Sequence, residues 1–385
     1  MKEAKRSGTL ILLRVKPFII LLLCIIIFPS QFFAQDTWVK EYDPFDVWNS
    51  KYETYSVRKL IKCYDGYVLG GFYEFVDQST LSSWGFMMKI DQNGNTIWTV
   101  QDYLDTGTLT FAMTSDEGFL CSGWERFTEN RYLLKRDSRG TFEWIKPHID
   151  FCPYTMKSTS DRCILLGGKS IDFSELVVKK LSESAEVIWS KTFSFNESTK
   201  VNLLTSIETS DRNLVLGGFV DLYGDGNRNA YIMKLDPMGN LLWSRTYDEF
   251  TDKDRCITMT ETNDNKILAV GDAYLGNTKM GLFWLLDENG TTVNFKLEGG
   301  NYALGNSNVV ALEDGSFICG GPQLIKIDKD LEIVWVRDQI CGGNERKLCL
   351  TEDNGFMFPA HVGNLFIITK TDSLGLVYND NFIKP

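Results

Sequence analysis

The stretch KLDPMGNLLW at residues 234–243 recurs, with its spacing intact, along the whole chain. The shared pattern is K-x-D-x-x-G-x-x-x-W. Some copies have other residues at these positions, but the spacing is the same in all of them. The other six copies are KIDQNGNTIW (89–98), KRDSRGTFEW (135–144), KLSESAEVIW (180–189), LLDENGTTVN (285–294), KIDKDLEIVW (326–335) and KTDSLGLVYN (370–379).

A second phrase, an Asp followed by an apolar run, precedes every copy of the first. The Asp of the first phrase, replaced once by Ser182, recurs in steps of 41–54 residues. A period of this length with short β-like runs is typical of propeller blades, whereas helical repeats would show apolar spacing of three and four. The second phrases are DGYVLGGF (65–72), DEGFLCSGW (116–124), DRCILLGGK (161–169), DRNLVLGGF (211–219), DNKILAVGD (264–272), DGSFICGGP (314–322) and DNGFMFPAH (353–361).

Each repeat contains four strand-like segments, so the sequence predicts an all-β fold, a seven-bladed β-propeller of four-stranded antiparallel blades. Within the first phrase, Asp is expected to accept turn N–H groups and Gly to take the left-handed backbone. The Trp then falls on the outermost strand, where a large flat ring can wedge between neighbouring sheets. The tryptophans assigned this structural role are Trp38, Trp98, Trp144, Trp189, Trp243 and Trp335.

A closed ring must join its last sheet to its first, because open edges invite pairing with other chains. Residues 37–42 (TWVKEY) resemble an isolated fourth strand, and Trp38 supplies the ring that Asn379 lacks in the last copy. We therefore predict one domain over residues 36–385, closed by pairing of residues 37–42 with the seventh blade. Residues 374–380 are expected to compete for that outer place or to extend it.

The repeated phrase is similar to the tryptophan-docking phrase of quinoprotein-type propellers, with a turn one residue shorter. The whole chain after residue 34 resembles secreted bacterial β-propeller repeat proteins. This resemblance implies the fold and export, but no particular activity, because propellers host many unrelated functions. A quinoprotein dehydrogenase would also be expected to carry two adjacent cysteines, and the sequence contains no Cys-Cys pair.

Residues 1–34 have a basic start, an apolar run over 18–28 and a break before Gln35, which predicts a secretory signal peptide. A retained anchor and lipidation at Cys24 are the alternatives. The signal peptide carries five basic residues and one acidic residue, a net +4, so the rest of a chain of charge −11 carries about −15. Such an acidic protein repels phosphate backbones, which argues against nucleic acid. We expect a periplasmic or secreted protein with no transmembrane segment in the mature chain.

Eight cysteines remain after residue 34, an even number that permits disulfides in an exported protein. Cys121 and Cys319 lie in apolar runs and are expected to be buried as small apolar side chains. Cys341 and Cys349 flank a Gly-Gly turn and are the candidates for a local bridge.

The loops between second and third strands vary in length, whereas the Asp-to-Trp turns are uniform. The variable loops and the blade-to-blade connections should share one face, here called the variable-loop face, where binding properties usually reside. An oxygen-rich loop on this face makes Ca²⁺ the candidate cofactor, against the alternative of a solvated acidic loop. The candidate ligands are Asp221, Asp225, Asn227 and Asn229.

Aromatic residues also concentrate in the first two variable loops. Exposed rings there could stack on sugars or hold a partner chain, against the alternative that they cover the blade tops. The candidate ligand-binding residues are Tyr73, Trp84, Trp124 and Tyr132.

No nucleophile motif or metal-ligand cluster points to catalysis, so no catalytic residue is assigned. The predicted function is a non-enzymatic module that binds protein or carbohydrate at the cell envelope. The alternative is a propeller enzyme, either glycan-cleaving or a quinoprotein-like oxidoreductase.

Overall fold

The computed structural model describes thirteen stretches of the chain, and statements about structure below refer to these. The signal peptide predicted at residues 1–34 lies outside them and stays a prediction. The described residues contain no helix of the length and apolar character that a membrane span requires. The stretches are 36–42, 53–77, 80–102, 106–125, 130–147, 150–195, 200–221, 226–247, 253–299, 308–321, 323–338, 347–362 and 365–378.

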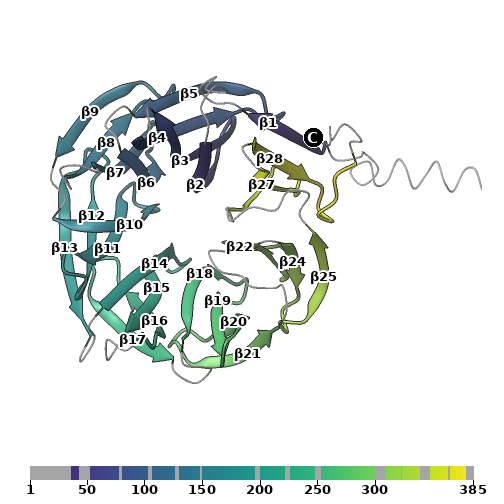
Figure 1. Cartoon of the computed structure of the whole chain (residues 1–385). Helices are drawn as coiled ribbons and strands as arrows, with labels where there is room; N and C mark the ends of the chain where they lie inside the picture. Colours follow the sequence, from purple (N-terminus) through teal and green to yellow (C-terminus); the bar gives the residue numbers. More distant parts are fainter. Residues whose placement is uncertain are drawn as a thin grey trace, which may run out of the picture.

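Seven antiparallel sheets of four strands each form a ring, so the predicted fold is confirmed (Figure 1). Blade 1 contains β2 (Glu53–Cys63), β3 (Gly66–Asp77), β4 (Thr80–Ile90) and β5 (Thr96–Asp102). Blade 2 contains β6 (Thr106–Met113), β7 (Phe119–Glu125), β8 (Arg131–Arg136) and β9 (Phe142–Pro147). Blade 3 contains β10 (Phe151–Ser158), β11 (Ile164–Ser170), β12 (Glu175–Leu181) and β13 (Val187–Ser194).

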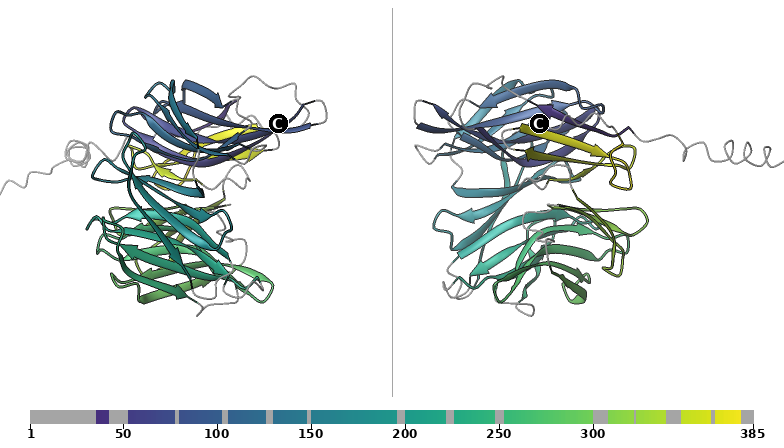
Figure 2. Two further views of the ribbon diagram at one scale, coloured as in Figure 1. Left: turned by 90° about the vertical axis from the view of Figure 1, so that its left-hand side faces the viewer. Right: turned by 45° about the vertical axis from the view of Figure 1, so that its right-hand side comes forward.

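The remaining blades complete the ring, which Figure 2 shows from two sides. Blade 4 contains β14 (Lys200–Glu208), β15 (Leu214–Asp221), β16 (Asn229–Leu235) and β17 (Leu241–Tyr247). Blade 5 contains β18 (Arg255–Glu261), β19 (Ile267–Leu275), β20 (Thr278–Leu286) and β21 (Thr292–Glu298). Blade 6 contains β22 (Asn308–Ala311), β23 (Phe317–Gly320), β24 (Gln323–Ile327) and β25 (Ile333–Asp338). Blade 7 contains β26 (Cys349–Leu350), β27 (Phe356–Val362), β28 (Leu365–Thr371) and β1 (Trp38–Tyr42).

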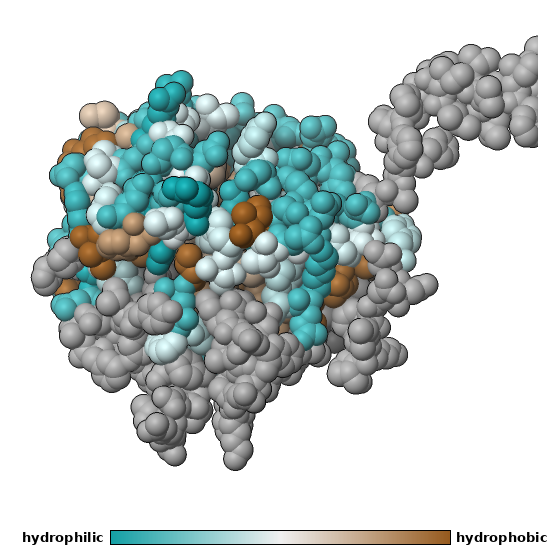
Figure 3. Space-filling model, turned by 90° about the horizontal axis from the view of Figure 1, so that it is seen from above, coloured by the Kyte–Doolittle hydropathy of each residue, from teal (hydrophilic) through white to brown (hydrophobic). Residues whose placement is uncertain are grey.

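The strands differ in burial according to their place in the blade. The second strand β15 is almost entirely buried, because neighbouring blades cover both of its faces. The outermost strand β17 is mostly exposed, and β13 alternates between exposed and half-buried positions. Seen from above, the surface is mainly hydrophilic with small separate hydrophobic patches (Figure 3).

The outer strand of blade 7 comes from the N-terminal end of the described chain. β1 pairs with β28 from Trp38 opposite Lys370 to Tyr42 opposite Phe366. The Tyr378 amide donates to the Thr37 hydroxyl at 3.0 Å, so the C-terminal segment lies against the start of this closing strand. Asn379 lies outside the described residues.

The turn of the first phrase forms as its residues predict. The Asp236 carboxylate accepts the amides of Met238 and Asn240 at 2.9 and 2.8 Å, and Gly239 has φ +80°. The same Asp contacts recur at Asp91, Asp137, Asp287, Asp328 and Asp372.

Each outer-strand tryptophan packs on the turn of the next blade. A Cβ atom at Gly290 in blade 5 would lie 2.6 Å from the Trp243 ring of blade 4, so only glycine allows this approach. The Trp243 indole also donates to the Glu288 carbonyl at 2.9 Å. Equivalent ring-on-glycine contacts join Trp38 to Gly94, Trp98 to Gly140, Trp189 to Gly239 and Trp335 to Gly375, while Trp144 packs in one cluster with Ala185.

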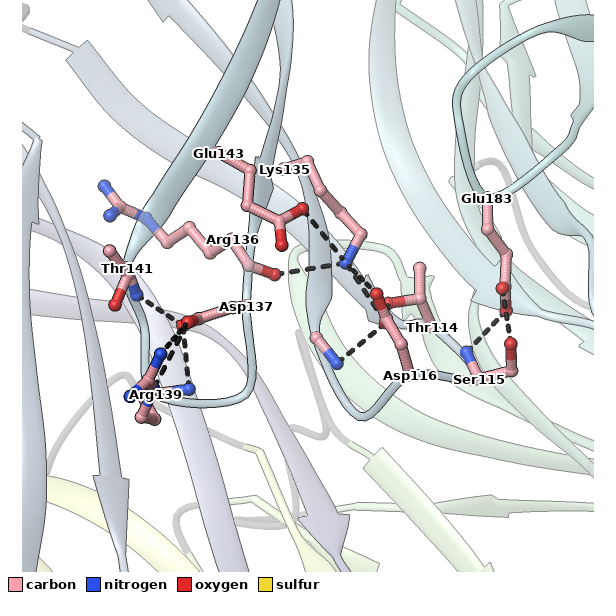
Figure 4. A network of polar contacts seen from close by, with 11 residues as sticks. Thr114, Ser115, Asp116, Lys135, Arg136, Asp137, Arg139, Thr141, Glu143 and Glu183 are labelled. Atoms are coloured by element: carbon pink, nitrogen blue, oxygen red, sulfur yellow. Dashed lines mark hydrogen bonds and ion pairs between the residues drawn. The ribbon is translucent and has the colours of Figure 1, made fainter.

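An ion pair that the sequence analysis did not anticipate connects the two phrases within a blade. Lys135, which opens the first phrase of blade 2, lies 2.8 Å from Asp116, which opens the second (Figure 4). The Lys side chain is buried and the Asp is half-exposed. The same pair forms in every blade but blade 5: Lys89–Asp65, Lys180–Asp161, Lys234–Asp211, Lys326–Asp314 and Lys370–Asp353.

Candidate functional site

Two of the four predicted ligand-binding rings are not on the surface. Tyr73 is 1% exposed and stacks on Tyr55 with ring centroids 5.6 Å apart, and Tyr132 is 4% exposed. Their expected exposure is therefore incorrect, because the side chains point into the joints between blades. Trp84 is half-buried and meets Tyr73 edge-on at 6.0 Å, and Trp124 is also half-buried.

The candidate calcium ligands are only partly described. Asp221 is 6% exposed at the end of β15, Asn227 is exposed and Asn229 begins β16. Asp225 lies outside the described residues. No group of three or more His, Cys, Asp or Glu side chains within the described stretches is arranged to hold a metal ion. The Ca²⁺ site stays a prediction.

The cysteine predictions have different outcomes. Cys121 and Cys319 are 1% and 0% exposed, which confirms their burial. Cys349 is a free thiol, so the proposed bridge to Cys341 is absent, and Cys341 itself lies outside the described residues. Burial of Cys349 beside the blade 1 and blade 7 core raises the pKa of its thiol, because β26 turns it toward that core.

An exposed aromatic surface does exist on the variable-loop face, in blade 3. Tyr154 is 44% exposed on β10, and Phe173 is 40% exposed in the turn between β11 and β12. The Lys169 ammonium lies 5.1 Å from the Tyr154 ring centroid and 3.9 Å from the Phe173 centroid. Ile171, 56% exposed, extends the apolar area. Lys169 itself is only 9% exposed and lies beneath the rings. These four residues are called the blade 3 surface.

The backbone holds Phe173 rigidly in an unusual conformation. Its φ is +65°, in a region that bulky side chains avoid and that often marks a functional constraint. The Phe173 amide donates to the Ser170 carbonyl at 3.0 Å, and its own carbonyl accepts the Val201 amide of blade 4 at 2.9 Å. Asp172 closes the turn by accepting hydrogen bonds from Ser170 and Ser174.

A β-bulge presents Tyr154. The pairing of β10 with β11 shifts between Pro153 and Thr155, which leaves Tyr154 unpaired, and such bulges re-aim side chains. Opposite the bulge, a Cβ atom at Gly168 would lie 1.9 Å from the Cys152 carbonyl oxygen, so the second glycine of the GG phrase cannot be replaced. The same shift occurs in blades 1, 2, 4 and 5.

Cationic groups surround the exposed rings. Burial raises the pKa of the Tyr154 hydroxyl, as does the Cys152 thiol, whereas Arg58 and Arg131 oppose the rise. Burial lowers the pKa of Lys169, whose ammonium donates to the Asn202 amide oxygen at 2.9 Å. The blade 3 surface therefore combines two fixed rings with hydrogen-bond donors of positive charge.

The sequence analysis missed Tyr154 and Phe173. The predicted rings come from the first two variable loops, whereas Tyr154 and Phe173 lie at a bulge and in a short turn of blade 3. The available signal was the sequence SIDFS at 170–174, a short turn between two strands that contains no glycine. In the structure, Phe173 takes the positive φ of this turn.

Carboxylates with strongly lowered pKa values serve the blade structure. Hydrogen bonds from Ser316 and Lys326 lower the pKa of Asp314 to about 2. Burial raises the pKa of Asp116, but hydrogen bonds from Lys135, Thr114 and the Gly118 amide outweigh it and bring the value to about 2. Both are members of the Lys–Asp pairs, so these shifts reflect structure and give no sign of acid–base catalysis.

Comparison with solved structures agrees on the fold. A streptogramin B lyase matches with a TM-score of 0.55 at 12% identity, over 87% of this chain and 98% of that chain. The WD40 β-propeller domain of Doa1 matches with a TM-score of 0.52 at 12% identity, over 85% and 97%. Virginiamycin B lyase from Staphylococcus aureus, in complex with quinupristin, matches with a TM-score of 0.52 at 10% identity, over 87% and 100%.

These similarities establish a seven-bladed propeller and do not extend to function, since enzymes and a WD40 domain appear among them. No protein-family model matches the sequence, and no curated protein matches it.

Proposed function

We propose that the protein is a non-enzymatic recognition module of the cell envelope that binds carbohydrate through the blade 3 surface. The observation that carries this proposal is the pair of exposed rings on either side of the ammonium group of Lys169, a side chain that is itself largely buried. Aromatic rings can stack on the apolar face of a sugar, while Lys169 and Asn202 offer polar contacts to its hydroxyls. Location at the envelope rests on the signal peptide predicted from residues 1–34.

A carbohydrate fits this surface better than a protein partner. A stable protein interface buries roughly 800 Å² per partner around an apolar centre. The blade 3 surface has only three exposed apolar side chains, with cations between and beside them. Small ligands need only a few such convergent groups.

The test compares the removal of aromatic side chains on the two faces of the propeller. Tyr154→Ala and Phe173→Asn remove the proposed contacts, and Asn is chosen because it tolerates positive φ. Tyr64→Ala is the matched control, since Tyr64 is 86% exposed in the β2–β3 turn on the opposite face. Binding to neutral and acidic envelope polysaccharides is measured by affinity electrophoresis.

We expect each blade 3 variant to bind roughly fivefold more weakly, in line with the loss of about 1 kcal/mol per stacked ring. Tyr64→Ala should bind like the unaltered protein, and all variants should keep its melting temperature within a few degrees. The proposal fails if no polysaccharide binds or if Tyr64→Ala weakens binding equally. Binding of a protein partner instead would replace carbohydrate as the ligand.

A further inference from the structure

Two exposed side chains of different chemistry occupy equivalent positions on the first strands of blades 1 and 3. The bulge that leaves Tyr154 unpaired in blade 3 has a counterpart in blade 1, where it leaves Arg58 unpaired. Both side chains are exposed, whereas the bulge residues of blades 4 and 5, Leu204 and Ile257, are half-buried and buried. Bulges of this kind re-aim side chains and are frequent beside functional sites.

The Arg58 and Tyr154 side chains contact equivalent positions of their second strands. The guanidinium carbon of Arg58 lies 4.9 Å from the Phe72 ring centroid, and the Tyr154 ring centroid lies 5.1 Å from the Lys169 ammonium. Phe72 and Lys169 each follow directly on a Gly-Gly pair, in β3 and β11. Blades 1 and 3 therefore contain the same cation–ring pair at the same level, with the two partners exchanged.

A hydrogen bond joins the first strands of blades 1 and 3 beside these positions. Lys59, the residue after Arg58, donates to the carbonyl of Met156, which lies two residues after Tyr154. The Lys59 ammonium lies 5.8 Å from the ring centroid of Phe111 in blade 2, which stands between the two strands. Because β2 and β10 are the innermost strands of their blades (Figure 1), Arg58 and Tyr154 both border the centre of the ring.

The Arg58 guanidinium group is available for a further acceptor. Within the described stretches it makes no ion pair, and its described contact is with the Phe72 ring. A guanidinium group that lies over a ring keeps its N–H donors at its edge, where a ligand can reach them. Arg58 also opposes the rise that burial causes in the pKa of the Tyr154 hydroxyl, as a nearby cation does.

We propose that the ligand of the blade 3 surface is an acidic sugar, whose carboxylate binds to Arg58 while its ring lies against Tyr154. This inference rests on the proposed carbohydrate binding and names the class of sugar. A carboxylate matches the planar guanidinium group, because it can accept two parallel charge-assisted hydrogen bonds. A hydroxyl of a neutral sugar accepts only an ordinary hydrogen bond from the same group, so Arg58 favours the acid.

The net negative charge of the protein does not oppose this binding strongly. At physiological ionic strength, exposed charges that are more than about 8 Å apart are largely screened from each other. The chain carries a net charge of −11, but most of its charged groups are farther than this from a carboxylate that touches Arg58. The charge of Arg58 itself therefore decides whether the acidic group is attracted.

A purely structural role for Arg58, as a cover for the Phe72 ring, makes different predictions. Arg228 of blade 4 covers the Phe219 ring in the same way, with 4.9 Å between its guanidinium carbon and the ring centroid. Arg228 is also exposed and makes no ion pair with a described residue, but it lies just before the third strand β16 and not at a bulge of a first strand. It is therefore the matched control for Arg58.

The test uses affinity electrophoresis in a glucuronate-bearing polysaccharide, and in the same polysaccharide after its carboxyl groups have been reduced to alcohols. We expect the unaltered protein to bind the acidic form roughly tenfold more tightly. Arg58→Gln should remove this preference. Arg58→Lys should keep part of it, because an ammonium group attracts a carboxylate without the two-point geometry. Arg228→Gln loses the same charge and should keep the full preference.

Salt gives a second readout on the unaltered protein. Raising the salt concentration from about 0.1 M to about 1 M shortens the Debye length from about 10 Å to about 3 Å. Binding of the acidic polysaccharide should weaken over this range, whereas binding of the carboxyl-reduced form should not. The same salt dependence for both forms would contradict a bound carboxylate.

Failure of this inference is distinguishable from failure of the proposed function. Tyr154→Ala should weaken the binding of both polysaccharide forms by the same factor, because the ring contacts either sugar. If it does so while the two forms bind the unaltered protein equally, or while Arg228→Gln loses the preference as Arg58→Gln does, the protein binds carbohydrate and the acidic-sugar inference is overturned. If neither form binds, both proposals fail.

Discussion

Single residues in this protein are constrained most strongly where the backbone of one strand approaches a neighbouring strand closely. A Cβ atom at Gly218 would lie only 1.9 Å from the Asn202 carbonyl oxygen. Lys59 experiences the opposite kind of constraint, since its ammonium group is held among other positive charges. Steric limits thus act at a glycine of a second strand, and electrostatic limits act at a lysine of a first strand.

The perturbed pKa of Lys59 gives a prediction for stability against pH. Its folded pKa of about 7 lies below the ordinary value of 10.5, so between these values the unfolded chain binds the proton that the folded chain has released. Stability contributed by this group therefore rises as pH increases above 7. We expect the urea midpoint of the unaltered protein to rise from pH 7 to pH 8.5 relative to that of Lys59→Met.

The comparison is limited to pH 8.5 because cysteine ionisation begins above it. Burial raises the pKa of Cys63 to about 11, so its unfolded thiolate opposes the trend at higher pH. Parallel urea midpoints for the two proteins across the range would contradict the lowered pKa of Lys59.

At the scale of the element, the joint between blades 5 and 6 is filled differently from the others. In most joints a tryptophan lies on a turn glycine, as Trp243 does on Gly290. Between blades 5 and 6 the glycine is replaced by Leu331, which is 1% exposed and packs in the core between these blades. The tryptophan is replaced by Asn294, whose amide donates to the Asp330 carbonyl at 3.2 Å. The two departures from the repeat therefore compensate for each other.

This compensation predicts the result of a double-mutant cycle. Leu331→Gly removes a buried side chain, at a cost of roughly 2–5 kcal/mol, and relieves about 1 kcal/mol of strain at φ +67°. Asn294→Trp alone should also destabilise, because Leu331 occupies the place of the ring. We expect the double variant to be more stable than the sum of the single effects by at least 1 kcal/mol, measured by urea unfolding. Simple additivity would show that the two fillings are independent.

The sequence predicts the elements of this fold well because their spacing is local. Asp236, Gly239 and Trp243 lie within one turn and one strand, and their roles follow from turn chemistry. The Lys234–Asp211 pair was not predicted, since the distance between the two phrases varies from blade to blade.

The candidate site was predicted less well for a physical reason. In a propeller both faces of a middle strand are buried, so alternation along the strand does not tell an exposed ring from a core ring. Tyr73 therefore resembled a surface residue in the sequence and is a core residue in the structure. Tyr154 owes its exposure to a bulge, which depends on pairing with Gly167 and Gly168 across the sheet.

At the scale of the whole molecule, the ring closes inside blade 7, at a seam where β28 and β1 are joined by strand pairing and not by a turn, because they lie at opposite ends of the described chain. β1 carries the connection: its backbone pairs with β28, and its side chains contact blade 1. Trp38 packs on Gly94, the Tyr42 hydroxyl donates to the Gly94 carbonyl at 2.6 Å, and Lys40 donates to Asn93 at 2.6 Å. The closing strand thus belongs to two blades at once.

Blade 4 contains the same pair of contacts within a continuous chain, and this gives a matched control for the seam. Trp243 packs on Gly290, and the Tyr247 hydroxyl donates to the Gly290 carbonyl at 2.7 Å. Trp38→Ala with Tyr42→Ala, and Trp243→Ala with Tyr247→Ala, therefore remove equivalent groups. In the first case β1 can separate from β28, whereas in the second the short turn between β16 and β17 keeps β17 in its blade.

We expect the seam variant to lose more stability than the blade 4 variant and to associate through the edge of β28, since exposed edges pair with other chains. Urea midpoints measure the first effect and light scattering the second. Amide exchange at residues 367–369 should accelerate only in the seam variant, because these residues pair with β1. Equal loss of stability in both variants, with no association, would mean that the ring is held by blade-to-blade packing alone and that its closing strand is dispensable.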